Sequence, residues 1–495
     1  MEILVNLKDE IGVIRPEIYG HFCEHLGECI YGGIWVGENS KIPNIAGIRK
    51  DVVEALKRVK VSVFRWPGGC FADCYHWQDG IGPKKERPKR VNYHWGKVIE
   101  TNEFGTHEFI QFCKLIGASP YICGNVGTGS PKELRDWIEY CNFEGESTLS
   151  LLRKQNGSES PFNVKYWGIG NENWGCGGHF TPEDYASEYR RFSTFAFEFG
   201  QKISLIACGP GGNDLQWTEK FFKKITEPGN YINRINGYAC HYYCGTAGTA
   251  TEYSTDEWYQ LLKKAIYMEK LIQDQRNLMD YFDPERKIEL IIDEWGTWHR
   301  PAPGRNPSFL WQQNTLRDAM VAALTLDILN RNADKVGMAN IAQTVNVLQS
   351  LILTFEDKIV LTPTYYVYQL YQKHQGGRSL KLFFDSPTVQ FKTDNGMDSL
   401  RTLSGSASLK DKKIFLTLTN SHTEMEDEIK VSLHGEVKIK GVSGKIITHP
   451  DFKAYNTTEE EKVKIDDFEV KVVADKEIIF HLLPKSIYGL EISLR

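Results

Sequence analysis

Residues 165–172, Lys-Tyr-Trp-Gly-Ile-Gly-Asn-Glu, form a short apolar run that ends in an amide and a carboxylate. Its length and its aromatic and β-branched side chains predict a β-strand. A helix start lies on each side, because Ser130 precedes Pro131 and Thr181 precedes Pro182, with carboxylates in the turn that follows. We expect the second helix to end at Gly200. Helix, strand and helix in this order are the parts of a parallel βα sheet.

The same pattern recurs between about residues 17 and 375. Eight β-rich runs alternate there with helical patterns: residues 18–22, 61–65, 121–125, 165–171, 203–208, 237–243, 288–294 and 336–343. Eight strands joined by helical crossovers predict an α/β fold of the (β/α)₈ TIM-barrel type. A doubly wound sheet is the alternative that the pattern leaves open.

After about residue 380 the periodicity changes to strict alternation, as at Ile414, Leu416 and Leu418. The absence of a long helical period predicts an antiparallel β-sandwich of the jelly-roll kind. Residues 3–7 alternate in the same way, so we expect this first strand to pair with the sandwich. The expected domains are residues 1–16 (a strand that joins the sandwich), 17–379 (the catalytic barrel) and 380–495 (the sandwich).

Composition narrows the class of protein. The 59 basic and 64 acidic side chains are interspersed and give a net charge of −5, so we expect neither nucleic acid nor a membrane surface as partner. The first residues lack the basic and apolar regions of a signal peptide, and no apolar run is long enough to span a membrane. Eleven cysteines, an odd number, suit a reducing compartment better than a disulfide framework. We therefore expect a cytoplasmic protein.

Polar side chains gather where the predicted strands end. In a barrel these ends converge on one face, where active sites lie. One polar residue at the start of a loop needs no explanation, but a set of them in the same relative position indicates a site. The set is Glu24, Arg65, Asn125, Asn171, Glu172, His241, Tyr243, Glu294 and Gln343.

Two carboxylates, Glu172 and Glu294, are the most informative members of this set. Glycines and Trp174 surround Glu172, and such an enclosed place disfavours the charged form of a carboxyl group, which suits a proton donor. Glu294 follows a fully apolar strand. Either residue alone is read as a surface loop carboxylate, but glycoside hydrolysis needs such a pair, one group to protonate the leaving oxygen and one to attack carbon or activate water.

Seven stretches resemble the family 51 glycoside hydrolases, the intracellular α-L-arabinofuranosidases. They are residues 18–27, 64–69, 77–83, 170–172, 241–243, 293–295 and 342–347. Their order and spacing hold over nearly the whole chain. The resemblance implies a retaining mechanism, with Glu172 as general acid/base and Glu294 as the nucleophile that forms a glycosyl-enzyme.

The resemblance also implies a set of residues around the sugar. The substrate-binding residues would be Glu24, Cys70, Asn171, Tyr243 and Gln343, and the supporting residues Arg65, His241 and Trp298. Asn171 would hold the 2-hydroxyl, while Arg65, His241 and Tyr243 would set the position and charge of Glu294. Trp298 is either a sugar platform or loop packing.

The family implies further that no metal and no organic cofactor take part, and that the chain assembles as a homo-oligomer, a hexamer or smaller. The implied substrates are arabinose-containing oligosaccharides derived from arabinoxylan or arabinan. A retaining β-xylosidase or endo-β-glucanase on the same barrel is the alternative activity. A non-catalytic carbohydrate-binding protein is the alternative from another class.

Cys70 is a departure from the family pattern, since many members carry a sugar-binding asparagine after Trp-Pro-Gly-Gly. A thiol is a poor hydrogen-bond partner. Cys176 lies four residues beyond Glu172, on a loop of the same barrel face, so the two sulfurs can approach each other. Because a cytoplasm keeps thiols reduced, we expect Cys70 to be a free thiol, with a disulfide as the alternative.

Overall fold

Eight parallel strands close into a barrel in the described part of the chain. The structure, a computed structural model, describes residues 1–227 and 231–495. Around the barrel the strand order is β10-β11-β12-β13-β2-β5-β8-β9. The strands are β2 (Gly20–Phe22), β5 (Val63–Trp66), β8 (Ser119–Gly124), β9 (Tyr166–Ile169), β10 (Ser204–Gly211), β11 (Gly237–Gly245), β12 (Glu289–Thr297) and β13 (Val336–Ile341). Each overlaps a predicted run, with ends that differ by a few residues, so the barrel is confirmed and the doubly wound alternative is wrong.

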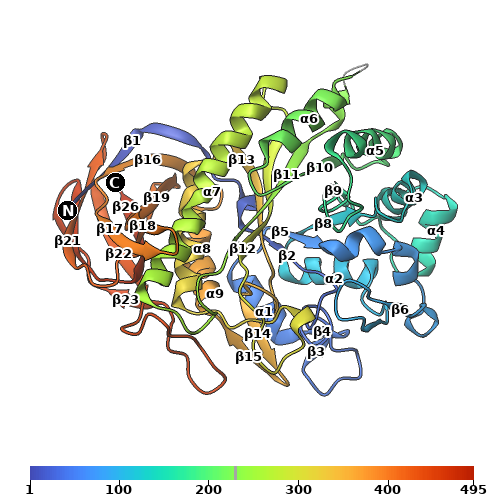
Figure 1. The fold of residues 1–495 in the computed structure, drawn as a ribbon, viewed down its shortest axis with the longest axis horizontal. Helices are drawn as coiled ribbons and strands as arrows, with labels where there is room; N and C mark the ends of the chain where they lie inside the picture. Colours follow the sequence, from blue (N-terminus) through green and yellow to red (C-terminus); the bar gives the residue numbers. More distant parts are fainter. Residues whose placement is uncertain (228–230) are drawn as a thin grey trace.

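Helices cover the outside of the barrel (Figure 1). They are α1 (Lys50–Arg58), α2 (Thr106–Ile116), α3 (Pro131–Asn142), α4 (Thr148–Gln155), α5 (Pro182–Phe195), α6 (Leu215–Ile225), α7 (Thr255–Phe282), α8 (Leu316–Arg331) and α9 (Pro363–Tyr371). Ser130 and Thr181 cap α3 and α5 as predicted, each accepting a backbone N–H through its hydroxyl. The predicted end of α5 at Gly200 is wrong: the helix ends at Phe195, and the Arg234 guanidinium binds the carbonyls of Ser193 and Ala196.

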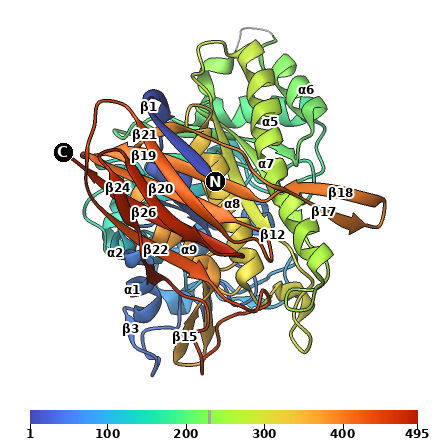
Figure 2. The ribbon, with the colours of Figure 1, turned by 90° about the vertical axis from the view of Figure 1, so that its left-hand side faces the viewer.

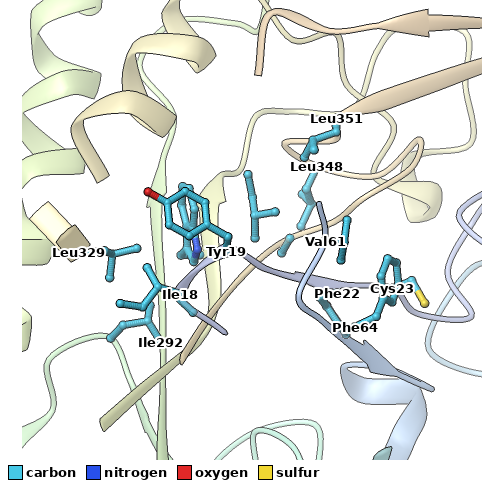
Figure 3. Packing of buried hydrophobic residues seen from close by; sticks show 14 of the residues in the cluster. Ile18, Tyr19, Phe22, Cys23, Val61, Phe64, Ile292, Leu329, Leu348 and Leu351 are labelled. Atoms are coloured by element: carbon cyan, nitrogen blue, oxygen red, sulfur yellow. The ribbon is translucent and has the colours of Figure 1, made fainter. Parts of the chain in front are cut away.

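Two layers of apolar side chains hold the barrel. One layer lies inside it and takes Val63, Tyr121, Tyr166, Ile206, Ala239, Ile291 and Met338, one from each of seven strands. A larger cluster fills the space between the strands and the helices. In Figure 3, Phe22, Phe64 and Ile292 of three strands appear with Leu329 of α8 in this cluster. The barrel is therefore filled, and its polar groups are confined to the strand ends.

A mostly antiparallel sheet forms the second unit. Within the described residues it has ten strands in the order β23-β22-β26-β20-β19-β16-β1-β21-β25-β24. Their bounds are β1 (Glu2–Val13), β16 (Arg378–Phe384), β19 (Leu403–Lys410), β20 (Lys413–Asn420), β21 (Asp427–His434), β22 (Ile439–Thr448), β23 (Asp466–Phe468), β24 (Lys471–Ala474), β25 (Glu477–Leu482) and β26 (Ser486–Leu494). Buried apolar side chains of these strands form a hydrophobic core separate from that of the barrel.

The N-terminal strand belongs to this sheet, as expected. β1 pairs antiparallel with β16 on one side (Figure 1) and parallel with β21 on the other (Figure 2). The parallel pair differs from the purely antiparallel sandwich that we predicted, because β1 enters the sheet from a distant part of the chain rather than through a hairpin. Helices α7 and α8 lie between the barrel and the sheet (Figure 1). The domain bounds assigned from the sequence stay predictions.

Four short hairpins complete the structure. They are β3 (Asn44–Ile45) with β4 (Ile48–Arg49), β6 (Arg90–Val91) with β7 (Ile99–Glu100), β14 (Ile352–Phe355) with β15 (Lys358–Leu361), and β17 (Thr388–Thr393) with β18 (Gly396–Arg401). Among the helices of the described residues, none combines the length and the apolar character that a membrane crossing requires.

Candidate active site

The strand ends bring nearly all of the predicted site residues to one face of the barrel. Glu24 follows β2, Arg65 lies in β5, the pair Asn171 and Glu172 follows β9, and Gln343 follows β13. The remaining members, His241 and Tyr243 of β11 and Glu294 of β12, lie on neighbouring paired strands. Asn125, just after β8, instead binds Thr128 of its own loop and the backbone carbonyl of Tyr75, which lies after η2 (Cys70–Cys74).

Glu294 is buried among groups that favour its charged form. Its Oε1 accepts a hydrogen bond from Arg65 Nη1 at 2.8 Å, and its Oε2 accepts one from the Tyr243 hydroxyl at 2.7 Å. Burial by itself would raise the pKa of Glu294, but the charges of His241 and Arg65 and these hydrogen bonds bring the pKa below its ordinary value. The geometry therefore keeps Glu294 ionised.

Glu172 is held differently. His241 Nδ1 lies 2.9 Å from Glu172 Oε1 and 3.5 Å from Glu294 Oε2, so the imidazole contacts both carboxyl groups and is closer to Glu172. Burial alone would lower the pKa of His241, but the Glu294 charge and the bond to Glu172 raise it. The side chain of Glu172 is 19% exposed, against 6% for Glu294. The two carboxyl groups thus lie on either side of His241, and Glu172 is the more exposed of the two.

A second polar group lies around Glu24. Its Oε1 accepts from Trp95 Nε1 at 2.7 Å and from the Phe71 N–H at 2.9 Å, and its Oε2 accepts from Gln343 Nε2 at 3.2 Å. Burial raises the pKa of Glu24 to about 7. Among the described residues, Asn171 Nδ2 and Gln343 Oε1 are buried without a hydrogen-bond partner. Buried polar atoms are usually paired, so these two are available to a ligand.

Three residues that the sequence did not single out belong to the site. Trp95 binds Glu24, as described above. Asp293 precedes Glu294 in β12, and its carboxylate lies 3.3 Å from Arg65 Nε. The same carboxylate accepts from Tyr121 OH and Asn340 Nδ2. Asp73 binds the chain just before Glu172. Asp293 could have been recognised by its place beside Glu294, but nothing in the sequence separates Trp95 or Asp73 from ordinary loop residues. Trp298, which was predicted, packs edge-on against Tyr243 with ring centroids 4.8 Å apart.

The expected free thiol at position 70 is wrong. Cys70 is bonded to Cys176, with Cα atoms 5.5 Å apart, inside the range that a disulfide requires. The short helix η2 (Cys70–Cys74) turns back toward the loop after β9, and the sequence alone cannot place these loops. Cys176 Sγ lies 3.6 Å from Glu172 Oε2. Because its sulfur is bonded, Cys70 has no S–H to donate, and its membership of the substrate-binding set stays a prediction.

Thiol titration checks the disulfide. All eleven cysteines lie in the described residues, and nine of them are unbonded. We expect the denatured, unreduced protein to react with nine equivalents of a thiol reagent, and with eleven after reduction. The Cys70→Ser variant should give ten free thiols before and after reduction, since its partner is then released. Eleven reactive thiols in unreduced wild-type protein would contradict the bridge.

Two groups of side chains in the described residues could approach a metal ion: Cys70 with Glu172 and Cys176, and Glu172 with His241 and Glu294. The two cysteines of the first group are joined to each other, and the members of the second already contact one another. We assign no ion to either group. That neither metal nor cofactor takes part stays an expectation.

Comparisons with known proteins agree with the sequence motifs. The alpha-L-arabinofuranosidase 1 domain matches residues 55–260, and the alpha-L-arabinofuranosidase C-terminal domain matches residues 293–486. The intracellular exo-alpha-L-arabinofuranosidase of Bacteroides ovatus is 45% identical over 457 residues, covering 91% of this chain and 87% of that protein. The alpha-L-arabinofuranosidase C of Emericella nidulans is 33% identical over 457 residues, covering 89% of both.

Solved structures give the same result for the fold. The crystal structure of the GH51 arabinofuranosidase from Xanthomonas axonopodis pv. citri has a TM-score of 0.95 at 42% identity, covering 99% of both chains. The Thermotoga maritima alpha-L-arabinofuranosidase, solved as an arabinose complex, has a TM-score of 0.87 at 34% identity, again covering 99% of both. The matches extend over both the barrel and the sheet, so the chain belongs to glycoside hydrolase family 51, the α-L-arabinofuranosidase family, and is a glycoside hydrolase.

Proposed function

We propose that this enzyme is a retaining exo-α-L-arabinofuranosidase. It releases terminal, non-reducing α-L-arabinofuranosyl residues from oligosaccharides derived from arabinoxylan or arabinan. The relatives that are named as arabinofuranosidases support the sugar, and the Bacteroides ovatus protein, named as an exo-acting and intracellular enzyme, supports terminal cleavage in the cytoplasm.

One distance carries the mechanistic part of the proposal. A carboxylate oxygen of Glu172 and one of Glu294 lie within 4.8 Å of each other. Retaining glycosidases hold their two carboxyl groups about 5 Å apart, whereas inverting enzymes leave roughly 6.5–9.5 Å for a water molecule. The short separation favours direct attack on the sugar by one carboxylate.

The surroundings assign the two roles. Glu294, kept ionised by Arg65 and Tyr243, is the nucleophile: its oxygen bonds to the anomeric carbon while the bond from that carbon to the leaving oxygen breaks. Glu172 gives its proton to the leaving oxygen. In the second step Glu172 takes a proton from water, the water oxygen bonds to the anomeric carbon, and Glu294 departs as a carboxylate.

The remaining side chains bind and orient the sugar in this proposal. Asn171 Nδ2 and Gln343 Oε1, which lack partners among the described residues, face hydroxyl groups, and Glu24 accepts from another. Arg65 donates to both Asn171 and Glu294 and so fixes the sugar-binding amide relative to the nucleophile. His241 keeps the Glu172 carboxyl group turned toward the reaction centre. The homo-oligomer implied by the family resemblance stays a prediction.

A pair of aryl glycosides tests the specificity. We expect kcat/KM for p-nitrophenyl α-L-arabinofuranoside to exceed that for p-nitrophenyl β-D-xylopyranoside by at least about 100-fold, because a site that hydrogen-bonds hydroxyls rejects a sugar that leaves them unpaired. Proton NMR of the first-formed arabinose should show the α-anomer. Preference for the xyloside, or release of internal fragments from a glucan, would move the assignment to the alternative activities.

A further inference from the structure

The turn that carries Glu172 has a backbone conformation that its own residues do not favour. Glu172 has φ of +44°, in the left-handed region that side chains other than glycine rarely adopt. Its carbonyl accepts from the N–H groups of Gly175 and Gly177, which closes the turn on one side. A residue in this region stays there only where neighbouring structure holds it, so the contacts on the other side of the turn decide where the Glu172 carboxyl group lies.

Asp73 supplies these contacts. It is a buried residue of η2, 1% exposed, and its carboxylate contacts the backbone of Asn171 rather than the unpaired Nδ2 atom of the Asn171 side chain. Its Oδ2 accepts the N–H of Asn171 at 2.9 Å, and its Oδ1 accepts the N–H groups of Val126 at 2.7 Å and Gly127 at 2.9 Å. One carboxylate therefore joins the segments that follow β5, β8 and β9.

The contact between Asp73 and the Glu172 turn is tightly packed, with no room for an added methyl group. A Cβ atom on Gly177 would lie 2.1 Å from the Asn171 carbonyl oxygen and 2.5 Å from Asp73 Oδ2. At its start, η2 is also bonded to the turn through the disulfide from Cys70 to Cys176. The helix η2 is therefore attached to the Glu172 turn at two points. Cys70 is bonded to Cys176, which follows Glu172, and Asp73 accepts from the N–H of Asn171, which precedes it.

The chemistry of position 73 requires a carboxylate. Its three shortest bonds come from backbone N–H groups, and Asn173 Nδ2 donates to Oδ2 at 3.5 Å. A carboxylate presents only acceptors to these donors, whereas an amide would present an NH₂ group to some of them. Burial outweighs the bonds from Asn171, Gly127 and Val126 and the charge of Arg65, which lower the pKa of Asp73, and the balance raises that pKa to about 7. The ionised form is the one that these donors fit.

We propose that Asp73 is a positioning residue for catalysis, which holds the turn of Asn171 and Glu172 so that the acid/base carboxyl group meets the leaving oxygen. The inference rests on the proposed role of Glu172. It assigns to Asp73 a part in proton transfer, exerted through the backbone of the turn that carries Glu172.

Asp73→Asn tests this with a change of one atom. Oδ1 accepts two of the three backbone bonds, so the amide oxygen keeps the bonds to Val126 and Gly127. The NH₂ group then faces the two donors of Oδ2, the N–H of Asn171 and Asn173 Nδ2. We expect kcat/KM for an unactivated arabino-oligosaccharide to fall about 10- to 100-fold. For an aryl arabinofuranoside with a strongly acidic phenol, whose departure needs no proton, kcat/KM should stay within about threefold of wild type.

Two further variants separate positioning from general damage. Gly177→Ala puts a methyl group into the same contact without changing a charge, and should show the same selective loss; it carries the test if Asp73→Asn does not fold. Asp327→Asn is the matched control, because Asp327 of α8 is an equally buried carboxylate with three hydroxyl donors, from Ser406, Thr417 and Thr419, at the sheet. It should lower thermal stability and leave the ratio of the two kcat/KM values unchanged.

The outcomes distinguish this inference from the proposed function. Equal losses on both substrates in Asp73→Asn and Gly177→Ala, or no loss on either, would overturn the positioning role, provided that Glu172→Ala shows the selective loss. If Glu172→Ala is itself unselective, the assignment of the acid/base group fails instead.

Discussion

The Glu294→Ala variant should lose on the order of 10⁴-fold or more of kcat/KM on every substrate, including aryl arabinofuranosides with good leaving groups. Without the carboxylate no group is placed to bond to the anomeric carbon, and leaving-group activation does not replace it. Azide is small enough to enter the vacated space beside Arg65 and Tyr243. It should restore turnover by forming a carbon–nitrogen bond as the leaving oxygen departs, and the arabinosyl azide should have inverted configuration by NMR.

The wild-type pH profile gives an independent check on Glu294. Its pKa is lowered in the folded protein, and only the ionised form attacks, so activity should persist as the pH falls and should be lost only below the ordinary titration range of a glutamate. Arg65→Met should move this acidic limb to higher pH, because it removes a charge that lowers the pKa. Near-wild-type hydrolysis by Glu294→Ala, or an azide product of retained configuration, would contradict the nucleophile assignment.

The Glu172→Ala variant should show a loss that depends on the leaving group. On an arabino-oligosaccharide, whose leaving alcohol needs a proton, kcat/KM should fall by roughly 10²–10⁴-fold. On an aryl arabinofuranoside with a strongly acidic phenol, kcat/KM should stay close to wild type, because this parameter reports the first chemical step. The rates of both substrates, measured on one protein preparation, give the comparison.

The second step supplies the control for this variant. Hydrolysis of the glycosyl-enzyme needs Glu172 as a base, so kcat on the activated substrate should be low, with a burst of released phenol. Azide needs no base, and it should raise kcat and give an azide of retained configuration, opposite to that expected for Glu294→Ala. A uniform loss on both substrates, or no response to azide, would assign the acid/base role to another residue.

Much of the barrel could be predicted from the sequence alone, because each strand gives two separate signals. Each combines a short apolar run with a polar residue where the run ends, and both signals are local. Glu294 after an apolar strand and Glu172 among glycines are examples, and the structure places both at the barrel mouth. The caps of α3 and α5 were equally local, since one hydroxyl and one proline define them.

What could not be predicted depends on contacts between distant segments. At the end of α5 the carbonyls of Ser193 and Ala196 accept from Arg234, which lies beyond the next helix. Asp73 matters because three backbone N–H groups from other segments point at it, and its own neighbours give no sign of them. Cys70 and Cys176 were expected to be reduced from the compartment, whereas their bond follows from how closely two loops approach. His241 lies beside Glu294 as expected, but its shorter contact, to Glu172 on another strand end, had no signal in the sequence.

The position of β1 in the sheet makes the two ends of the barrel segment depend on one strand. β1 stands between β16 and β21, and without it the sheet would separate into two pieces, one ending at β16 and the other beginning at β21. The strand at residues 2–13 is synthesised first, yet its partners lie at residues 378–384 and 427–434. All barrel strands lie between β1 and β16 in the sequence, so the pairing of β1 with β16 joins the two ends of the barrel segment. Neither partner of β1 exists until the barrel residues have been synthesised, and loss of β1 would leave β16 and β21 each with one unpaired edge.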